Sequence, residues 1–413
     1  MTRKKKILIS VTSVILVLVI GYCTCVFSNI PFIKKWRTIY IETAMTTATH
    51  QWLATAFIPG YIIDDVMGDA REQQVIQDGL QSSWGEIEEP TPSLPSIDVD
   101  IKNETPTIDT KPNEEEIEMD KPEEVKPSQE EIFFEKFWEV DKEKLKNYMS
   151  SKNIESYEDL LIENLSGGID ISTTFGEKIK VLDNKNNLLI VEVTGEGYSG
   201  LLAIVKDPAQ VTVAKSTTLG SYGNLISKFS KDNNALVAIN ASGFADENWQ
   251  GNGGTITGSM VIDGIDYGNP SERLKFFGFK EDNRFYIENY NVENVKNFKW
   301  GIQFSPALIV DGEIYVQGSF GYGLQPRSAV GQSRTGEFLM LIIDGRQVGH
   351  SLGATVTDLA EIMLRHDAYQ AMNLDGGSSS IMTYKGETIN KPSSTNSLGR
   401  YLPNAFICKY AGE

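Results

Sequence analysis

A long acidic, proline-rich run divides this 413-residue chain and limits what can fold on either side of it. Residues 86–131 carry sixteen Asp or Glu against four Lys, and they hold seven of the fifteen prolines. Such a run buries too little apolar surface to offset the entropy lost on ordering, so we expect an extended, self-repelling linker. The net charge of −18 also argues against nucleic acid as a partner.

An uncharged apolar run from Ile7 to Phe27 follows Arg3 and three lysines near the N-terminus. The run is long enough to cross a bilayer, and it exceeds the apolar region of a secretory signal peptide. No small-x-small cleavage site follows it. The sequence therefore predicts a single-pass membrane anchor with an extracellular C-terminal domain, and a cleaved signal peptide is the alternative.

Composition and periodicity divide the chain into five segments. These are a cytoplasmic tail and anchor at 1–28, a juxtamembrane helical segment at 29–84, the acidic linker at 85–130, a helical lead-in at 131–165 and one globular domain at 166–413. The juxtamembrane segment predicts two short helices, broken at Pro59 and Gly60, that lie at the membrane interface or on a partner such as an envelope-synthesis complex. Apolar residues at helical spacing also predict a helix in "SYEDLLIENL" at 156–165.

From Ser166 onward, short apolar runs bounded by Gly, Asn and Asp are typical of strands. Two helical patterns interrupt them, "YGNLISKFSK" at 222–231 and "TVTDLAEIMLRH" at 355–366. In the second, Thr355 and Asp358 have the spacing of a capping box. We therefore predict the α+β class, with mixed β-sheets and a few helices around one large core.

Several predicted strands end in a polar residue followed by glycine. For Asp263-Gly264 and Asp311-Gly312 an ordinary turn is expected, because glycine accepts positive φ and Asp bonds its own backbone. Asp375 differs, because two glycines and three serines follow it in "NLDGGSSS". Such a run can direct backbone N–H groups and hydroxyls toward an anion.

Two further candidates are Arg327 in "QPRSAVGQS" and Asn240 in "NASGF". A planar guanidinium beside small residues suits a phosphate. No Walker phosphate loop, G-x-S-x-G elbow or Cys/His zinc spacing is present in the sequence. His366 ends the second helix, where a cation suits the dipole, whereas a site role stays open for His350. Carboxylate chemistry is therefore the first enzyme hypothesis.

Taken together and in order, six segments resemble the phosphodiester glycosidase family over about residues 166–410. They are "NASGF", "SPALIVDGE", "QPRSAVGQS", "LIIDGR", "GATVTDLAEIM" and "NLDGGSSS". The resemblance implies a hydrolase that cleaves a sugar-1-phosphodiester, and for a surface chain of this kind it implies a cell-envelope or exopolysaccharide substrate. A phosphate leaving group needs less help from a general acid than an ordinary glycoside does.

The resemblance also implies roles for individual residues. Asp375 is expected as nucleophile or general base, Arg327 as a ligand of the phosphate, and Asp344 in sugar positioning or as a second carboxylate. The substrate-binding residues that it implies are Asn240, Gly243, Phe244, Arg346, Asn373, Gly376, Gly377, Ser378, Ser379 and Glu361. Two positions depart from the family pattern: Ser378 stands where a third glycine is common, and Asp358 stands where a glutamate is common, with Glu361 one turn away as a substitute.

Three alternatives stay open at the level of sequence. The domain could bind anionic envelope glycans without cleaving them, or it could act as a structural or assembly factor. Calcium or magnesium could assist hydrolysis, since Asp344, Asp375 and Asn240 all offer oxygen ligands. Residues 170–413 carry 21 Lys or Arg against 26 Asp or Glu, so local cations must meet an anionic substrate.

Overall fold

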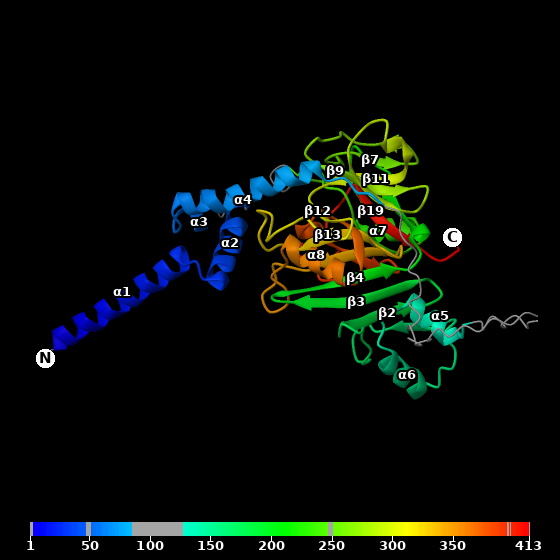
Figure 1. The fold of residues 1–413 in the computed structure, drawn as a ribbon, viewed down its shortest axis with the longest axis horizontal. Helices are drawn as coiled ribbons and strands as arrows, with labels where there is room; N and C mark the ends of the chain where they lie inside the picture. The colour runs from blue at the N-terminus through cyan, green and yellow to red at the C-terminus, as the bar shows by residue number, and fades with distance from the viewer. Residues whose placement is uncertain are drawn as a thin grey trace, which may run out of the picture.

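The computed structural model describes residues 3–46, 51–84, 127–246, 251–394, 396 and 398–412. The predicted acidic linker at 85–130 falls almost entirely outside these residues. Figure 1 shows a C-terminal body of sheets flanked by helices, with helix α1 (Arg3–Phe27) leading away from it.

A nine-stranded sheet forms the centre of the domain. Its middle strand is the apolar run "FLMLII" at 338–343, which is buried throughout. This is the pattern expected of strands covered on both faces. In spatial order the strands are β1 (Leu161–Glu163), β2 (Lys178–Asp183), β3 (Leu188–Gly195), β4 (Tyr198–Val205), β15 (Phe338–Ile343), β14 (Arg327–Ser333), β16 (Ala368–Asn373), β12 (Ala307–Val310) and β13 (Glu313–Ile314).

Two five-stranded sheets pack on one face of the large sheet. One has the order β10 (Phe285–Asn289), β9 (Lys275–Lys280), β11 (Phe298–Phe304), β7 (Met260–Ile262) and β8 (Ile265–Asp266). The other has the order β18 (Glu387–Thr388), β17 (Met382–Tyr384), β6 (Ala235–Asn240), β19 (Asn404–Lys409) and β5 (Val211–Lys215). The rings of Phe338, Trp300 and Phe406, one from each sheet, meet with centroids 5.4–6.1 Å apart. The three sheets therefore share one core.

Helices cover the other face of the large sheet. α5 (Gln129–Lys136), α6 (Lys142–Ser151) and α8 (Val356–Arg365) bury their apolar side chains against it in a second core. α7 (Ile226–Asp232) packs instead on the outer face of the sheet that contains β6 and β19. Helices on one face and small sheets on the other leave the ends of the strands as the place for a site.

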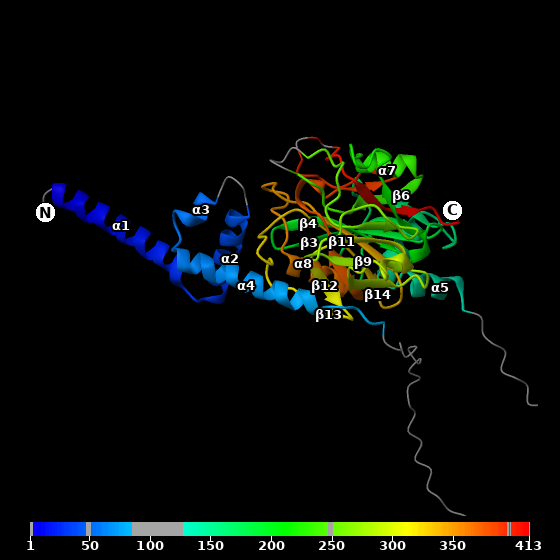
Figure 2. The same ribbon diagram turned by 90° about the horizontal axis from the view of Figure 1, so that it is seen from above.

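The helices that precede the acidic run form a small bundle beside the domain (Figure 2). α2 (Pro31–Met45), α3 (Trp52–Thr55) and α4 (Gly60–Gly79) share an apolar cluster with the end of α1, and α4 reaches from this bundle to the domain. Within α1, residues 9–27 have a mean hydropathy of 2.4 and are long enough to cross a membrane. A secretory signal sequence would meet the same criterion, so α1 is a single span or a signal.

The structure confirms the α+β class, and it confirms helices in the two segments of the domain that predicted them. Thr355 and Asp358 form the predicted capping box, in which the Asp358 carboxylate accepts from the Thr355 N–H at 2.7 Å. Asp263 and Asp311 have positive φ and are each followed by a positive-φ glycine, as expected of their turns.

Two predictions about the fold are wrong. The sheets are not mixed, because every strand pair in the described residues is antiparallel. The helix α8 does join two strands of the same direction, β15 and β16, but β14 lies between them and pairs antiparallel with both. The segment 156–165 is not helical, because Leu161–Glu163 adds to the edge of the large sheet as β1, where β2 satisfies its backbone hydrogen bonds.

Candidate active site

Three motifs of the sequence meet at one edge of the large sheet. The register pairs Arg327 with Ile343, the last residue of β15, and pairs Ala329 with Asn373, the last residue of β16. β14 therefore begins where its two neighbours end. Asp344 directly follows Ile343, and Asp375 lies two residues after Asn373. Antiparallel pairing therefore brings the Arg327, Asp344 and Asp375 segments together.

A fourth motif reaches this edge from a different sheet. Asn240 is the last residue of β6, and its side-chain Nδ2 donates to the backbone oxygen of Asp375 at 2.7 Å. Its Oδ1 accepts from Ser328 Oγ at 2.8 Å. Asn240 is thus a buried brace that fixes the Asp375 backbone between two sheets.

Glycine is required in the loop that follows Asp375. A Cβ on Gly376 would lie 2.7 Å from the Pro326 carbonyl oxygen, and Gly377 has a φ of 63°. The Gly377 N–H donates to that same carbonyl oxygen at 2.8 Å. The loop then makes one turn of 3₁₀ helix at Gly377–Ser379. It is therefore held against the start of β14.

The Asp375 carboxyl group is the more strongly perturbed acid of the site. Asp375 is half-buried, and burial raises the pKa of its carboxyl group to about 6. A hydrogen bond from Ser379, the charge of Arg400 and the Gly376 N–H oppose that rise. A carboxyl group with such a pKa can exchange a proton near neutral pH.

Asp344 is held by a different set of donors. His350 Nε2 lies 2.8 Å from its Oδ2, Asn390 Nδ2 donates to its Oδ1 at 2.8 Å, and the Lys391 N–H donates to it at 3.1 Å. Burial raises the pKa of Asp344, and hydrogen bonds from His350, Asn390 and the Lys391 N–H counteract that rise. The His350 side chain stays 26% exposed, so it can meet solvent or a ligand.

Asn390 joins the two carboxylate loops. The Nδ2 that donates to Asp344 also donates to the Ser380 backbone oxygen at 3.1 Å, and Ser380 closes the loop that begins at Asp375. The hydroxyl oxygens of Ser328 and Ser380 also lie within hydrogen-bond distance of each other, at 3.1 Å. The loops after β15 and β16 are therefore parts of one hydrogen-bonded unit.

The two arginines of the predicted motifs occupy different environments. Arg327 is 5% exposed, its Nε donates to the Ala354 carbonyl at 3.1 Å, and its Nη2 donates to the Gly323 carbonyl at 2.8 Å. Arg346 lies at the surface with a φ of 59°, and its guanidinium packs against Gly377 while Nη2 donates to Gln325 Oε1 at 2.5 Å. Arg346 is therefore the arginine that a ligand can reach.

The other predicted positions lie around this unit. Phe244 is buried and its ring is covered by the Arg400 guanidinium at 4.8 Å, and Gly243 lies against the Phe304 ring. Asn373 Nδ2 donates to the Ser305 carbonyl at 3.1 Å. Ser378 lies in the 3₁₀ turn, and Ser379 hydrogen-bonds Asp375. Glu361 is exposed on α8, away from the hydrogen bonds that join the two loops.

Sequence reasoning missed two residues of this unit and left a third undecided. No sequence motif singles out Asn390 or Arg400, and the sequence alone leaves a site role for His350 open. Arg400 donates from Nη1 to Asp246 Oδ2 at 2.7 Å and is the one nearby cation that lowers the pKa of Asp375. The sequence signal for Arg400 is weak, since "SLGRYLPN" at 397–404 shows only a single cation among uncharged residues.

Asp344, Asp375 and Asn240 are the candidate ligands of calcium or magnesium. Within the described ranges, no three His, Cys, Asp or Glu side chains gather as a metal site. Asn240 Oδ1 and both oxygens of Asp344 already accept hydrogen bonds from the protein. Sugar release measured with calcium, with magnesium and with a chelator tests a metal requirement.

A buried carboxylate (Asp344) and a half-buried one (Asp375) are joined by a hydrogen-bonded network and lie beside an accessible arginine. This arrangement suits carboxylate chemistry on an anionic ligand. Residues 233–409 match the phosphodiester glycosidase family, which is a family of glycoside hydrolases.

Individual relatives match over shorter lengths. The chain is 34% identical over 70 residues to N-acetylglucosamine-1-phosphodiester alpha-N-acetylglucosaminidase of Bos taurus, which is 17% of this chain and 13% of that protein. It is 26% identical over 176 residues to SPbeta prophage-derived uncharacterized protein YomE of Bacillus subtilis (strain 168), which is 39% of this chain and 26% of that protein. The alignments span about a quarter or less of these curated relatives.

Among solved structures, the catalytic domain of zebrafish N-acetylglucosamine-1-phosphodiester alpha-N-acetylglucosaminidase, auto-inhibited by its pro-peptide, matches with a TM-score of 0.45 and 21% identity. The match covers 54% of this chain and 82% of that one. A hypothetical protein from Synechocystis matches with a TM-score of 0.42 and 16% identity over 56% of this chain and 63% of that chain.

Proposed function

We propose that this protein is a membrane-anchored extracellular hydrolase that cleaves a sugar-1-phosphodiester in cell-envelope or exopolysaccharide glycans. The observation that carries the proposal is the half-buried Asp375 on a glycine loop that packs against Arg346. Burial raises the pKa of its carboxyl group to about 6. The family match of residues 233–409 supports a glycosidic bond to phosphate as the bond that breaks.

In the proposed reaction, Asp375 acts as general base or as nucleophile at the anomeric carbon. As a base it takes a proton from water, the water oxygen bonds to the anomeric carbon, and the bond from that carbon to the phosphate oxygen breaks. The electron pair stays on the phosphate, which leaves as a monoester. Free sugar and a phosphomonoester are the products.

We assign charge stabilisation of the leaving phosphate to Arg346, with Ser378 as a neighbouring donor. Ser379 is buried and already hydrogen-bonds Asp375. Arg327, which we had expected at the phosphate, fits a supporting role better, because its Nε and Nη2 already donate to carbonyl oxygens. His350, oriented by Asp344, is placed to hold a sugar hydroxyl or the attacking water.

The test uses the full chain in detergent micelles. The protein is incubated with α-N-acetylglucosamine-1-phosphodiester and with matched substrates of other sugars, and release of free sugar is measured with calcium, with magnesium and with a chelator. Asp375→Asn is the site variant, and Asp263→Asn is the matched control, because Asp263 lies in a turn that Asn tolerates.

Sugar release by the parent and the control, with a large loss in Asp375→Asn, supports the proposal. Tight binding without release for every sugar and ion would instead favour a module that binds anionic glycans. Neither binding nor release would favour the envelope-assembly role.

A further inference from the structure

Helix α4, which precedes the acidic run, makes buried hydrogen bonds with the domain. Gln77, at the end of α4, is fully buried, and its Nε2 donates to the Ala307 and Tyr315 carbonyls, both at 3.0 Å. Its Oε1 accepts from the Ala307 N–H at 2.8 Å. Beyond the helix, the Ser82 N–H donates to the Ile287 carbonyl at 2.8 Å.

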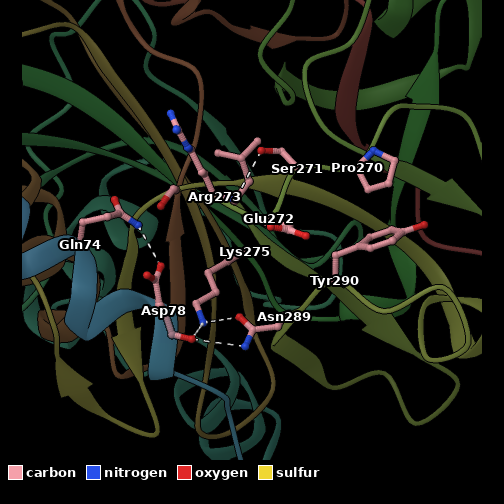
Figure 3. A pocket seen from close by; sticks show the side chains of 11 residues that line it. Gln74, Asp78, Pro270, Ser271, Glu272, Arg273, Lys275, Asn289 and Tyr290 are labelled. Carbon is pink, nitrogen blue, oxygen red and sulfur yellow. Dashed lines mark hydrogen bonds between the residues drawn. The ribbon is translucent and has the colours of Figure 1, made fainter.

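A buried lysine of the domain closes the C-terminal end of α4. Lys275 Nζ donates to the carbonyl oxygen of Asp78 at 3.1 Å and to Asn289 Oδ1 at 2.7 Å (Figure 3). It also donates to the carbonyl oxygen of Leu80 at 2.6 Å. A cation suits the negative end of the helix dipole. α4 is thus fixed at the wall of a cavity of about 610 Å³ that contains none of the carboxylate-loop residues.

α2 makes a second attachment, and this one reaches the site. Glu42 is 5% exposed, and its carboxylate accepts from Ser319 Oγ and from the Gly321 N–H at 3.1 Å. The next residue, Thr43, accepts at Oγ1 from the Leu324 N–H at 3.2 Å. The contact is close, since a Cβ on Gly323 would lie 2.1 Å from Thr43 Oγ1.

The loop at 317–325 that α2 holds is also the loop that supports the active site. Its Gly323 carbonyl accepts from Arg327, and its Gln325 side chain accepts from Arg346. The next residue, Pro326, offers the carbonyl that receives the Gly377 N–H. Glu42 therefore holds the loop at 317–325 by hydrogen bonds, and this loop and Pro326 in turn hold Arg346 and Gly377.

We propose that Glu42 is a positioning residue of the active site, through which helix α2 holds the loop at 317–325 and thereby orients Arg346 and the Gly376–Ser380 loop. The expected effect on kcat rests on the proposed function. The expected effect on the order of the loops rests on the contacts alone. The proposal makes the segment before the acidic run a part of the catalytic unit. A chain that begins after that run lacks the helix that holds the loop at 317–325.

The chemistry of the contact explains why a carboxylate is placed there. Burial raises the pKa of Glu42, while the Ser319 and Gly321 donors and the charge of Arg327 lower it. A buried charge is costly unless its oxygens are matched by donors, and an apolar side chain would pack as well at lower cost. The carboxylate supplies what an apolar side chain lacks, namely acceptors for the Ser319 hydroxyl and the Gly321 N–H.

The test compares Glu42→Ala, Glu42→Gln and Thr43→Val in the full chain, with Glu72→Gln as the control. Glu72 is an exposed carboxylate on α4, so its loss removes the same charge from the same bundle. The first readout is amide hydrogen exchange, which needs no substrate. The second is kcat and KM for sugar release, and thermal unfolding checks the fold.

We expect Glu42→Ala to speed exchange of the Gly321 and Gly377 N–H groups by about ten-fold, because local opening needs less free energy once a hydrogen bond is lost. Glu42→Gln keeps an acceptor and should restore part of the protection. Thr43→Val should speed exchange at Leu324. In kinetics, kcat should fall more than KM rises in Glu42→Ala, and Glu72→Gln should match the parent.

Faster exchange at Gly321 with unchanged exchange at Gly377 and unchanged kcat would overturn the proposal, because the loop would then be held without affecting the site. Unchanged exchange at Gly321 would overturn it as well. If the parent releases no sugar, the proposed function fails, and exchange at Gly377 still decides whether α2 orders the site.

Discussion

In the loop after β15, three donors surround the Asp344 carboxylate, and one of them is the partly exposed His350. In the loop after β16, burial outweighs the help that Asp375 receives from Ser379 and the Gly376 N–H, so its pKa rises to about 6. Two carboxylates in different environments take different roles. We infer that Asp344 orients a neighbour and that Asp375 exchanges the proton or attacks.

The largest effect should come from the loop after β16. Asp375→Asn keeps the shape of the side chain and removes its basicity, so we expect kcat for sugar release to fall about a thousand-fold. KM should change little. The control Asp263→Asn should match the parent, and near-parental kcat in Asp375→Asn would remove Asp375 from the chemistry.

Asp344 and His350, both in the loop after β15, should act as a pair. Asp344→Asn and His350→Gln should each lower kcat/KM about a hundred-fold, since the carboxylate acts by orienting the imidazole. The double variant should then lose little more than either single variant, as a double-mutant cycle would measure. Losses that multiply would mean that Asp344 acts on the substrate independently of His350.

The pH dependence separates the two loops. If Asp375 works as base or nucleophile, kcat/KM should rise about ten-fold per pH unit below its pKa of about 6 and level off above it. A rate profile from pH 4 to 8 measures this limb, and Asp344→Asn should preserve it. A fall in rate as the pH rises through 6 would make Asp375 a general acid instead.

Arg346 connects the loops, because it belongs to the first and packs on Gly377 of the second. Arg346→Asn should raise KM for the phosphodiester about ten-fold by removing a charge-assisted contact, and Asn tolerates the positive φ of this position. Arg273→Ala is the control, since Arg273 is exposed beside the cavity at α4. An equal KM in both variants would argue against a phosphate role for Arg346.

The smallest effect concerns stability. The folded protein binds the Asp375 proton more tightly than the unfolded chain does, so the contribution of this group to stability is full below pH 4 and is lost as the pH rises through about 6. Asp375→Asn should therefore increase the free energy of unfolding by about 1–2 kcal/mol at pH 7.5 and by little at pH 4. Denaturant titrations at both pH values measure the difference, and an equal change at both would contradict it.

Much of the domain could be predicted from local patterns. The apolar runs predicted the strands, the spacing of Thr355 and Asp358 predicted the start of α8, and the order of the motifs predicted the family of residues 233–409. These features depend on residues near one another in the chain, such as a side chain that caps its own helix. Strand pairing has no such local signal. The predictions of mixed sheets and of a helix at 156–165 were therefore wrong, because both depended on which strands pair with each other.

The sequence by itself determined the candidate residues for the chemistry: a carboxylate on a glycine loop, a second carboxylate at a strand end, and arginines among small residues. Only the tertiary structure decided what each one contacts. Arg327 is buried behind the site and Arg346 beside it, because the register of β14, β15 and β16 sets which side chains meet at their ends. The contact of Glu42 with Gly321 joins residues 279 positions apart, and packing alone brings them together.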